Sequence, residues 1–164
     1  MNIKYLRKKK FAVYGLGITG LSVINFFKRN NIKEFYTWDD TIFKKNNFKK
    51  KKFLKILDIV DYIVISPGID IKVSKFEKKL LFNKKKIITD IDLFFLINNV
   101  RNSILVTGTN GKSTTCKLIH HILKKNKFKT LLAGNIGKPI LDTKYNSKII
   151  YVIETSSYQL SYSK

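Results

Sequence analysis

The sequence contains a single cysteine, Cys116, in 164 residues, so no disulfide can form within the chain. A lone thiol is typical of a reducing compartment, and we expect the protein to lie in the cytoplasm. No apolar run reaches the roughly 18 residues that a membrane-spanning helix requires. The sequence therefore offers neither the framework of a disulfide-rich secreted domain nor a membrane span.

Arginine is also scarce, since only three of the 33 basic residues are arginines, while acidic residues number 11 and the net charge is +22. A charge of this size is typical of nucleic-acid binding. Arginine, however, is the residue whose planar fork best grips phosphates and base edges. The abundant lysine, isoleucine, asparagine, phenylalanine and tyrosine all have A/T-rich codons. We therefore interpret the charge as codon bias with a solvated lysine surface, and we expect no specific nucleic-acid partner.

Apolar segments of strand length alternate with amphipathic segments of helix length along the whole chain. We expect strands at 9–15, 34–40, 61–68, 86–89, 103–108, 129–134 and 148–154, and helices at 19–30, 72–83, 90–97 and 113–125. The lysine-rich segment 44–55 reads as a surface loop and helix without chemistry. Continuous apolar strands between helices predict an α/β fold with parallel sheets covered on both faces.

The segment GLGITG forms a glycine-rich turn between the first strand and the first helix. Gly15, Gly17 and Gly20 follow the Gly-x-Gly-x-x-Gly pattern, and Asp39 ends the next strand about 19 residues later. In this pattern the first glycine makes the turn, the second lets a ligand approach the backbone, and the third lets the helix meet the strand. The helix N-terminus then offers free N–H groups to a diphosphate. The turn therefore predicts a nucleotide site.

A second glycine-rich turn, in VTGTNGKSTT, also follows a strand and opens a helix. The usual phosphate-binding loop would place its first glycine at position 106, where Val106 stands. A shorter loop can still form the phosphate nest if Gly108 and Gly111 supply the special backbone angles, with Val106 left in the strand. The residues that we expect to bind ATP here are Gly108, Thr109, Asn110, Gly111, Lys112, Ser113 and Thr114.

Two oxygen-bearing side chains predict a magnesium site beside this loop. Ser113 follows the lysine of the loop, and Glu154 ends the buried strand at 148–154. Ligands of open α/β sheets gather at the carboxyl ends of strands, and carboxylate and hydroxyl oxygens suit Mg²⁺. Two nucleotide turns in one chain favour a protein that holds both a nucleotide-linked substrate and ATP.

Six segments occur in an order and spacing that resemble the Mur ligase family of peptidoglycan synthesis. They are GLGITGLSVINFF, ISPGI, DIDLF, VTGTNGKSTT, GNIGKP and ETSSYQL, and they span nearly the whole chain. The shortened loop GTNGKS is itself the family's form of the phosphate loop. The resemblance implies a Rossmann-like parallel-sheet domain for the UDP substrate at 1–97. It also implies the first, incomplete part of a P-loop-type α/β ATP-binding domain at 98–164, so we read the chain as a fragment. The part of the family that lies further along carries a carbamylated lysine, a metal-binding histidine and the amino-acid site.

The resemblance also implies roles for individual residues. The UDP-muramoyl substrate would contact Gly17, Ile18, Thr19, Asp39 and Gly68, and Asn135 would lie between this substrate and ATP. The catalytic residues would be Lys112, on the ATP phosphates, and Glu154, on Mg²⁺ together with Ser113. The family pattern has a basic residue shortly after the aspartate of the second strand, and here Asp40 and Thr41 follow instead.

The activity implied is the ATP-dependent addition of D-glutamate to UDP-N-acetylmuramoyl-L-alanine through an acyl phosphate, by an enzyme that is monomeric at full length. Other Mur-type ligases, which add L-alanine to UDP-N-acetylmuramate or glutamates to folate, are the nearest alternatives. A nicotinamide-dependent oxidoreductase would use the first glycine turn and leave the second without a role. A nucleic-acid-binding protein would explain the charge alone.

Overall fold

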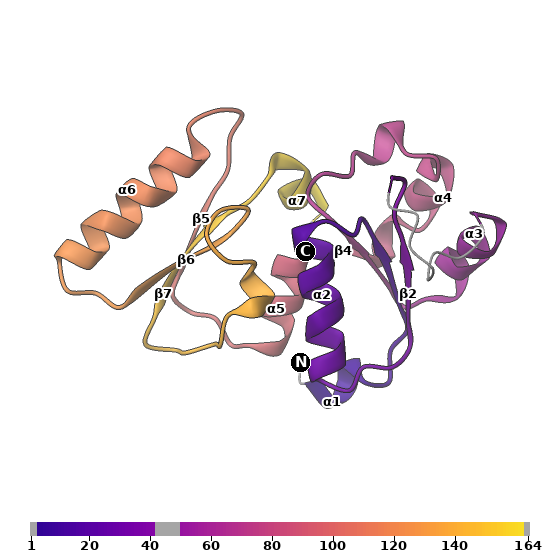
Figure 1. Cartoon of the computed structure of the whole chain (residues 1–164), viewed down its shortest axis with the longest axis horizontal. Helices are drawn as coiled ribbons and strands as arrows, with labels where there is room; N and C mark the ends of the chain where they lie inside the picture. The colour runs from indigo at the N-terminus through magenta and orange to yellow at the C-terminus, as the bar shows by residue number, and fades with distance from the viewer. Residues whose placement is uncertain (1–2, 42–49, 163–164) are drawn as a thin grey trace.

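The computed structural model describes residues 3–41 and 50–162, which form an α/β structure with two separate parallel sheets. Figure 1 shows one sheet in each half of the molecule, with helices α2 and α5 lying between them. The expected α/β class is therefore confirmed. Of the lysine-rich segment, residues 44–49 lie outside the described part, and α3 covers Lys50–Ile59.

The first sheet has the strand order β2-β1-β3-β4, with all neighbours parallel. Its strands are β1 (Phe11–Tyr14), β2 (Phe35–Trp38), β3 (Tyr62–Ile65) and β4 (Ile87–Ile88). Phe11 and Val13 face the core cluster that includes α2 (Ile18–Arg29), whereas Ala12 and Tyr14 face the cluster that includes α3 and α4 (Glu77–Phe82). Both faces are covered, as expected. The chain leaves β1 and β3 in opposite directions, so their carboxyl ends form the crevice where ligands of such sheets bind.

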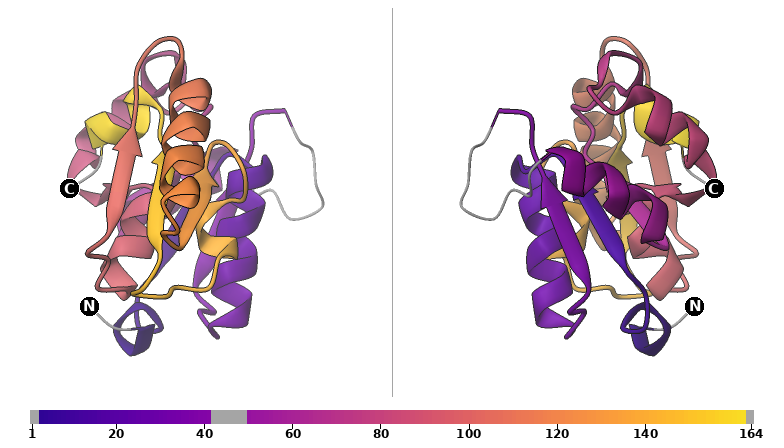
Figure 2. Two further views of the ribbon diagram at one scale, coloured as in Figure 1. Left: turned by 90° about the vertical axis from the view of Figure 1, so that its left-hand side faces the viewer. Right: turned by 90° about the vertical axis from the view of Figure 1, so that its right-hand side faces the viewer.

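The second sheet has the order β5-β7-β6 and is less completely covered. Its elements are β5 (Ser103–Val106), β6 (Thr130–Gly134), β7 (Ile150–Glu154) and the helix α6 (Lys112–Lys125), which lies across one face in the left view of Figure 2. On the other face, the rings of Phe94 and Tyr151 meet at 5.4 Å. Ile104 and Leu105 stay 37% and 41% exposed. The expectation of cover on both faces is wrong for β5, because it is an edge strand and α6 packs mainly on β6 and β7.

The helix expected at 72–83 begins later in the structure. A 3₁₀ turn, η1 (Ile71–Val73), comes first, and α4 starts only at Glu77. The Ser74 backbone N–H donates to the Ile71 carbonyl, and the Ser74 hydroxyl accepts from the Phe76 N–H at 3.0 Å. These local bonds compete with a helical start. Four short elements were not expected from the sequence: α1 (Ile3–Leu6), η2 (Lys84–Lys86), η3 (Ile140–Asp142) and α7 (Ser157–Tyr162).

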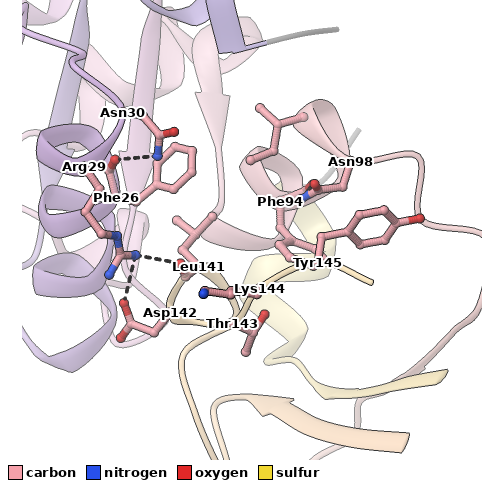
Figure 3. Close-up of a pocket in the computed structure, with 11 residues that line it drawn as sticks. Phe26, Arg29, Asn30, Phe94, Asn98, Leu141, Asp142, Thr143, Lys144 and Tyr145 are labelled. Atoms are coloured by element: carbon pink, nitrogen blue, oxygen red, sulfur yellow. Dashed lines mark hydrogen bonds and ion pairs between the residues drawn. The ribbon is translucent and has the colours of Figure 1, made fainter. Parts of the chain in front are cut away.

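The two halves of the molecule share one hydrophobic core. Buried residues of α2, α5 (Asp90–Ile97), η3 and β7 belong to a single cluster. A hollow of about 270 Å³ lies at this junction, and its lining is drawn in Figure 3. There Arg29 Nη2 donates to the Leu141 carbonyl at 2.9 Å and lies 3.4 Å from the Asp142 carboxylate. These contacts fix the position of the second sheet against the first, which in turn positions the site described next.

Candidate functional site

A cleft of about 450 Å³ opens where the carboxyl ends of β1, β3 and β6 meet. Its lining contains all six residues that we predicted to contact the muramoyl substrate, namely Gly17, Ile18, Thr19, Asp39, Gly68 and Asn135. Five come from the first half of the chain and Asn135 from the second. The sequence did not predict the part of the wall that is formed by Ser66, Pro67 and Gly134. The structure thus assembles the predicted residues into one surface, although they are up to 118 positions apart in the sequence (135 − 17).

The glycine turn is closed toward the protein and open toward the cleft. A Cβ atom on Gly20 would lie 1.9 Å from the Gly15 carbonyl oxygen, so only glycine permits this approach of helix and strand. The Ser66 hydroxyl donates to the same carbonyl at 2.9 Å. By contrast, a Cβ on Gly17 would meet nothing within 4 Å, and Ile18 is 79% exposed. A ligand can therefore approach the backbone at Gly17 and cover Ile18.

Asp39 ties the end of β2 to the glycine turn. One carboxylate oxygen accepts from the Leu16 backbone N–H at 2.6 Å, and the other accepts from the N–H and the hydroxyl of Thr41, each at 2.8 Å. Sequence reasoning assigned Asp39 to a ligand alone and missed this structural role. Because the residue also lines the cleft, a ligand would meet a carboxylate that the protein already holds in place.

Asp40, which follows Asp39 where the family pattern leads to a basic residue, has a structural role. Its carboxylate accepts from the Tyr14 hydroxyl and, at 3.0 Å, from the Trp38 indole N–H, and Lys75 lies 3.6 Å away. Burial, together with the Asp40 hydrogen bond, raises the pKa of Tyr14 well above its usual range. Asp40 thus serves the core of the first half, and it is absent from the lining of the cleft.

The second glycine turn has the backbone geometry that a shortened phosphate loop needs. Val106 is the last residue of β5 and pairs with Glu154, as expected. Gly108 has φ 149° and Gly111 has φ 75°, a region that residues with a side chain rarely adopt. Helix α6 starts at Lys112, so the N–H groups of its first turn have no partner within the helix. The Lys112 ammonium lies over the loop, where it donates to the carbonyls of Gly108 at 2.7 Å and Thr109 at 3.1 Å.

The two predicted magnesium ligands meet beside this loop. The Ser113 hydroxyl donates to Glu154 Oε2 at 2.7 Å, and Glu154 is only 6% exposed. Within residues 3–41 and 50–162, no basic side chain forms an ion pair with this carboxylate. Buried carboxylates are usually paired or bind a metal, and a hydroxyl with a carboxylate suits Mg²⁺ that also binds phosphate oxygens. The residues present therefore fit the predicted ion.

The cleft and the phosphate loop adjoin at the ends of β6 and β7. Gly134 pairs with Glu154, and the Asn135 backbone N–H donates to the Glu154 carbonyl at 3.0 Å. The Asn135 side chain reaches Gln159, which in turn reaches Asp90. Sequence reasoning missed Asp90 and Gln159, although both lie in quoted family segments, DIDLF and ETSSYQL. A ligand in the cleft would therefore lie next to a nucleotide on the loop.

Two other side chains that could act as a nucleophile or a base, Cys116 and His120, have the surroundings of structural residues. Cys116 is buried in α6, and burial raises the pKa of its thiol, which suits a small core residue. The His120 ring lies 3.3 Å from the Thr130 hydroxyl. Across residues 3–41 and 50–162, no group of three or more His, Cys, Asp or Glu side chains could hold a metal, and no helix is long and apolar enough to cross a membrane.

Comparison with known proteins shows what the chain is similar to. Residues 106–163 match the model of the Mur ligase middle domain. The chain is 40% identical to a UDP-N-acetylmuramoylalanine–D-glutamate ligase of Wolbachia sp. subsp. Brugia malayi, with 98% of this chain and 34% of that protein covered. Proteins of the same name from Rickettsia bellii and Buchnera aphidicola are 41% and 37% identical, over 96% and 93% of this chain and 36% of each relative. The chain thus spans about a third of the length of the curated relatives it matches.

Proposed function

We propose that this chain belongs to the Mur ligase family and carries the substrate and nucleotide sites of an ATP-dependent ligase that adds D-glutamate to UDP-N-acetylmuramoyl-L-alanine. The observation that carries the proposal is the junction at Asn135 and Glu154, where the cleft meets the phosphate loop. A ligase that phosphorylates a carboxylate needs this adjacency, because the carboxylate must reach the terminal phosphate of ATP.

We assign the first site to residues 1–97 and the second to residues 98–164. In the first, the glycine turn receives the diphosphate of the UDP substrate, with Gly17, Ile18 and Thr19 nearest to it and Asp39 toward the uridine. Gly68, across the cleft, passes close to the substrate. Asn135 belongs to the second segment and contacts the muramoyl part from the far wall. The open space over Gly17 and the exposed Ile18 support this placement.

In the second site, the N–H groups at the start of α6 and the Lys112 ammonium hold the ATP phosphates. Ser113 and Glu154 would hold Mg²⁺, which when bound neutralises phosphate charge. The alanyl carboxylate attacks the γ-phosphate and forms an acyl phosphate with release of ADP. The amine of D-glutamate then displaces phosphate and forms the amide. Bringing two anions together costs Coulomb energy, and the Lys112 charge with the loop N–H groups offsets it.

The alternatives explain fewer of these observations. A nicotinamide-dependent oxidoreductase would use the glycine turn and Asp39, but the Lys112–Ser113–Glu154 group would have no role. Ligases for L-alanine or folate share the second site, so the contents of the cleft distinguish them. We further propose a cytoplasmic location and a monomeric full-length enzyme.

Isothermal titration of the 164-residue chain tests the contents of the cleft. We expect UDP-N-acetylmuramoyl-L-alanine to bind in preference to UDP-N-acetylmuramate and to NAD. Gly17→Val should weaken this binding at least about 10-fold, because the added side chain meets no protein atom within 4 Å yet fills the approach to the backbone. Lys28→Ala, at the exposed end of the same helix, is the matched control and should bind as the wild type does. Binding of NAD without binding of the UDP-muramoyl ligand would refute the proposal.

A further inference from the structure

Asp90 is a buried acidic residue to which the mechanism above gives no role. It is the first residue of α5 and is 3% exposed. Its Oδ1 accepts a hydrogen bond from Gln159 Nε2 at 2.9 Å, across 69 residues of sequence. Gln159 lies in α7 and is also buried. Burying a carboxylate costs free energy of folding even when an amide donates to it. A pair that joins the two halves of the molecule at such a cost is therefore a candidate for a functional role.

The other end of the Gln159 amide faces the cleft wall. Its Oε1 accepts from Asn135 Nδ2 at 3.1 Å, from the Ser156 N–H at 2.8 Å and from the Thr155 hydroxyl at 3.3 Å. An ionised carboxylate can only accept, so Gln159 must turn its NH₂ group toward Asp90 and its oxygen toward Asn135. Asn135 must therefore donate through its own NH₂ group. The remaining acceptor of the Asn135 amide is Oδ1, on a residue that lines the cleft.

We propose that Asp90 is a positioning residue, which through Gln159 fixes the orientation of the Asn135 amide so that Asn135 Oδ1 accepts an N–H or O–H group of the substrate. The inference rests on the proposed function only for the identity of that substrate, a UDP-linked sugar with an attached amino acid. Without the carboxylate, the Ser156 N–H and the Thr155 hydroxyl alone would hold the Gln159 oxygen, so the orientation of both amides would be less strictly fixed. In the turned-over form, Asn135 would offer N–H groups where an acceptor is needed. A wrongly turned amide both loses a bond and leaves a polar group unpaired.

The surroundings of Asp90 keep its carboxylate ionised at neutral pH, and the ionised form favours the observed orientation of the two amides. Burial raises its pKa to about 6, so the carboxylate is ionised at pH 7, and the Gln159 amide and the Ile91 backbone N–H favour that form. The nearest other acid, Asp92, has its carboxylate occupied by the N–H of Thr89 at 2.7 Å and the Thr89 hydroxyl at 2.9 Å. Asp92 thus caps the helix and, within the described part of the chain, forms no hydrogen bond with Gln159, which makes it a matched control.

The test replaces the carboxylate of Asp90 with an amide, first alone and then together with the reverse exchange at Gln159. In Asp90→Asn, the backbone N–H groups at the start of α5 retain the side-chain oxygen, so the new NH₂ group faces the NH₂ group of Gln159. It then favours the reversed orientation of both amides, against the Ser156 N–H, which favours the original one. We expect affinity for UDP-N-acetylmuramoyl-L-alanine at pH 7.5 to fall about 10-fold by calorimetry. Adding Gln159→Glu restores an acceptor toward Asn135, and the double variant should return to within about 3-fold of the wild type. Asp92→Asn should stay within about 2-fold.

A second measurement requires no ligand. In ¹⁵N NMR spectra of the free chain between pH 5 and 8, the side-chain NH₂ signals of Gln159 and Asn135 should shift together with a midpoint near pH 6. Both shifts should vanish in Asp90→Asn. The inference is overturned if Asp90→Asn binds as the wild type does, if the double variant is no better than the single one, or if the Asn135 signal does not follow Asp90. Failure of the wild type to bind the ligand, with the NMR coupling intact, would instead refute the proposed function.

Discussion

Lys112→Ala is expected to lower the turnover of a ligase that contains this segment by about 10²–10³-fold. The Lys112 ammonium already lies over the phosphate loop, held by the carbonyls of Gly108 and Thr109. In the proposed mechanism it is therefore a preorganised positive charge at the place where negative charge is transferred, and its removal would leave the repulsion between the two anions uncompensated. Steady-state rates with saturating ATP and UDP-muramoyl substrate measure the effect.

Two variants separate this charge effect from general damage to α6. Lys117→Ala removes an exposed lysine from the same helix and should leave turnover unchanged. Glu154→Ala should raise the Mg²⁺ concentration needed for activity as well as lower the rate, because it removes a metal ligand and not a phosphate contact. Near-wild-type turnover in Lys112→Ala would show that GTNGKST is only a structural turn, and the ATP-dependent account would fail with it.

Asp90→Asn is expected to abolish a loss of stability that the wild type shows between pH 4 and pH 7, although the variant binds the ligand more weakly. The folded-state pKa of Asp90 is raised from 3.8 to about 6, so the protonated carboxyl favours folding below pH about 4 and that contribution is lost as the pH rises through 6. The shift of about 2 units corresponds to about 3 kcal/mol in the free energy of unfolding. The variant has no charge to bury and should not show this loss.

Urea unfolding of both proteins at pH 4 and pH 7 measures the difference. Between the two pH values, the wild type should lose about 3 kcal/mol relative to Asp90→Asn. Parallel changes in the two proteins would show that Asp90 titrates as an ordinary exposed acid. A more stable protein with weaker binding would indicate that the buried carboxylate is retained for the site and not for the fold.

The parts of the site that a short segment determines were predictable from the sequence. The glycine turn at 15–20 and the phosphate loop at 108–113 are local strand–turn–helix units, and the structure places both as expected. Glu154 was found because it ends a buried strand, and parallel strands bring their carboxyl ends to one edge of a sheet. The six expected cleft residues also come together, because each follows the carboxyl end of a parallel strand.

The parts that depend on long-range contacts were not predictable. The helix expected at 72–83 starts at Glu77, because the Ser74 hydroxyl accepts a hydrogen bond from the Phe76 N–H and the large side chain of Phe76 is drawn into the core. The exposure of Ile104 and Leu105 follows from the strand order, which periodicity does not reveal. The bond between Asp90 and Gln159 joins residues that are 69 positions apart and of ordinary type, so no local pattern marks it.

Simultaneous binding of two ligands tests the central claim most directly, namely that the cleft and the phosphate loop form adjoining sites. The measurement is a calorimetric titration of UDP-N-acetylmuramoyl-L-alanine into the 164-residue chain, with and without a saturating Mg²⁺ complex of a non-hydrolysable ATP analogue. We predict that each ligand binds once and that both bind together. Gly17→Val should remove only the first and Lys112→Ala only the second. Mutually exclusive binding, or loss of both ligands in either variant, would contradict the account.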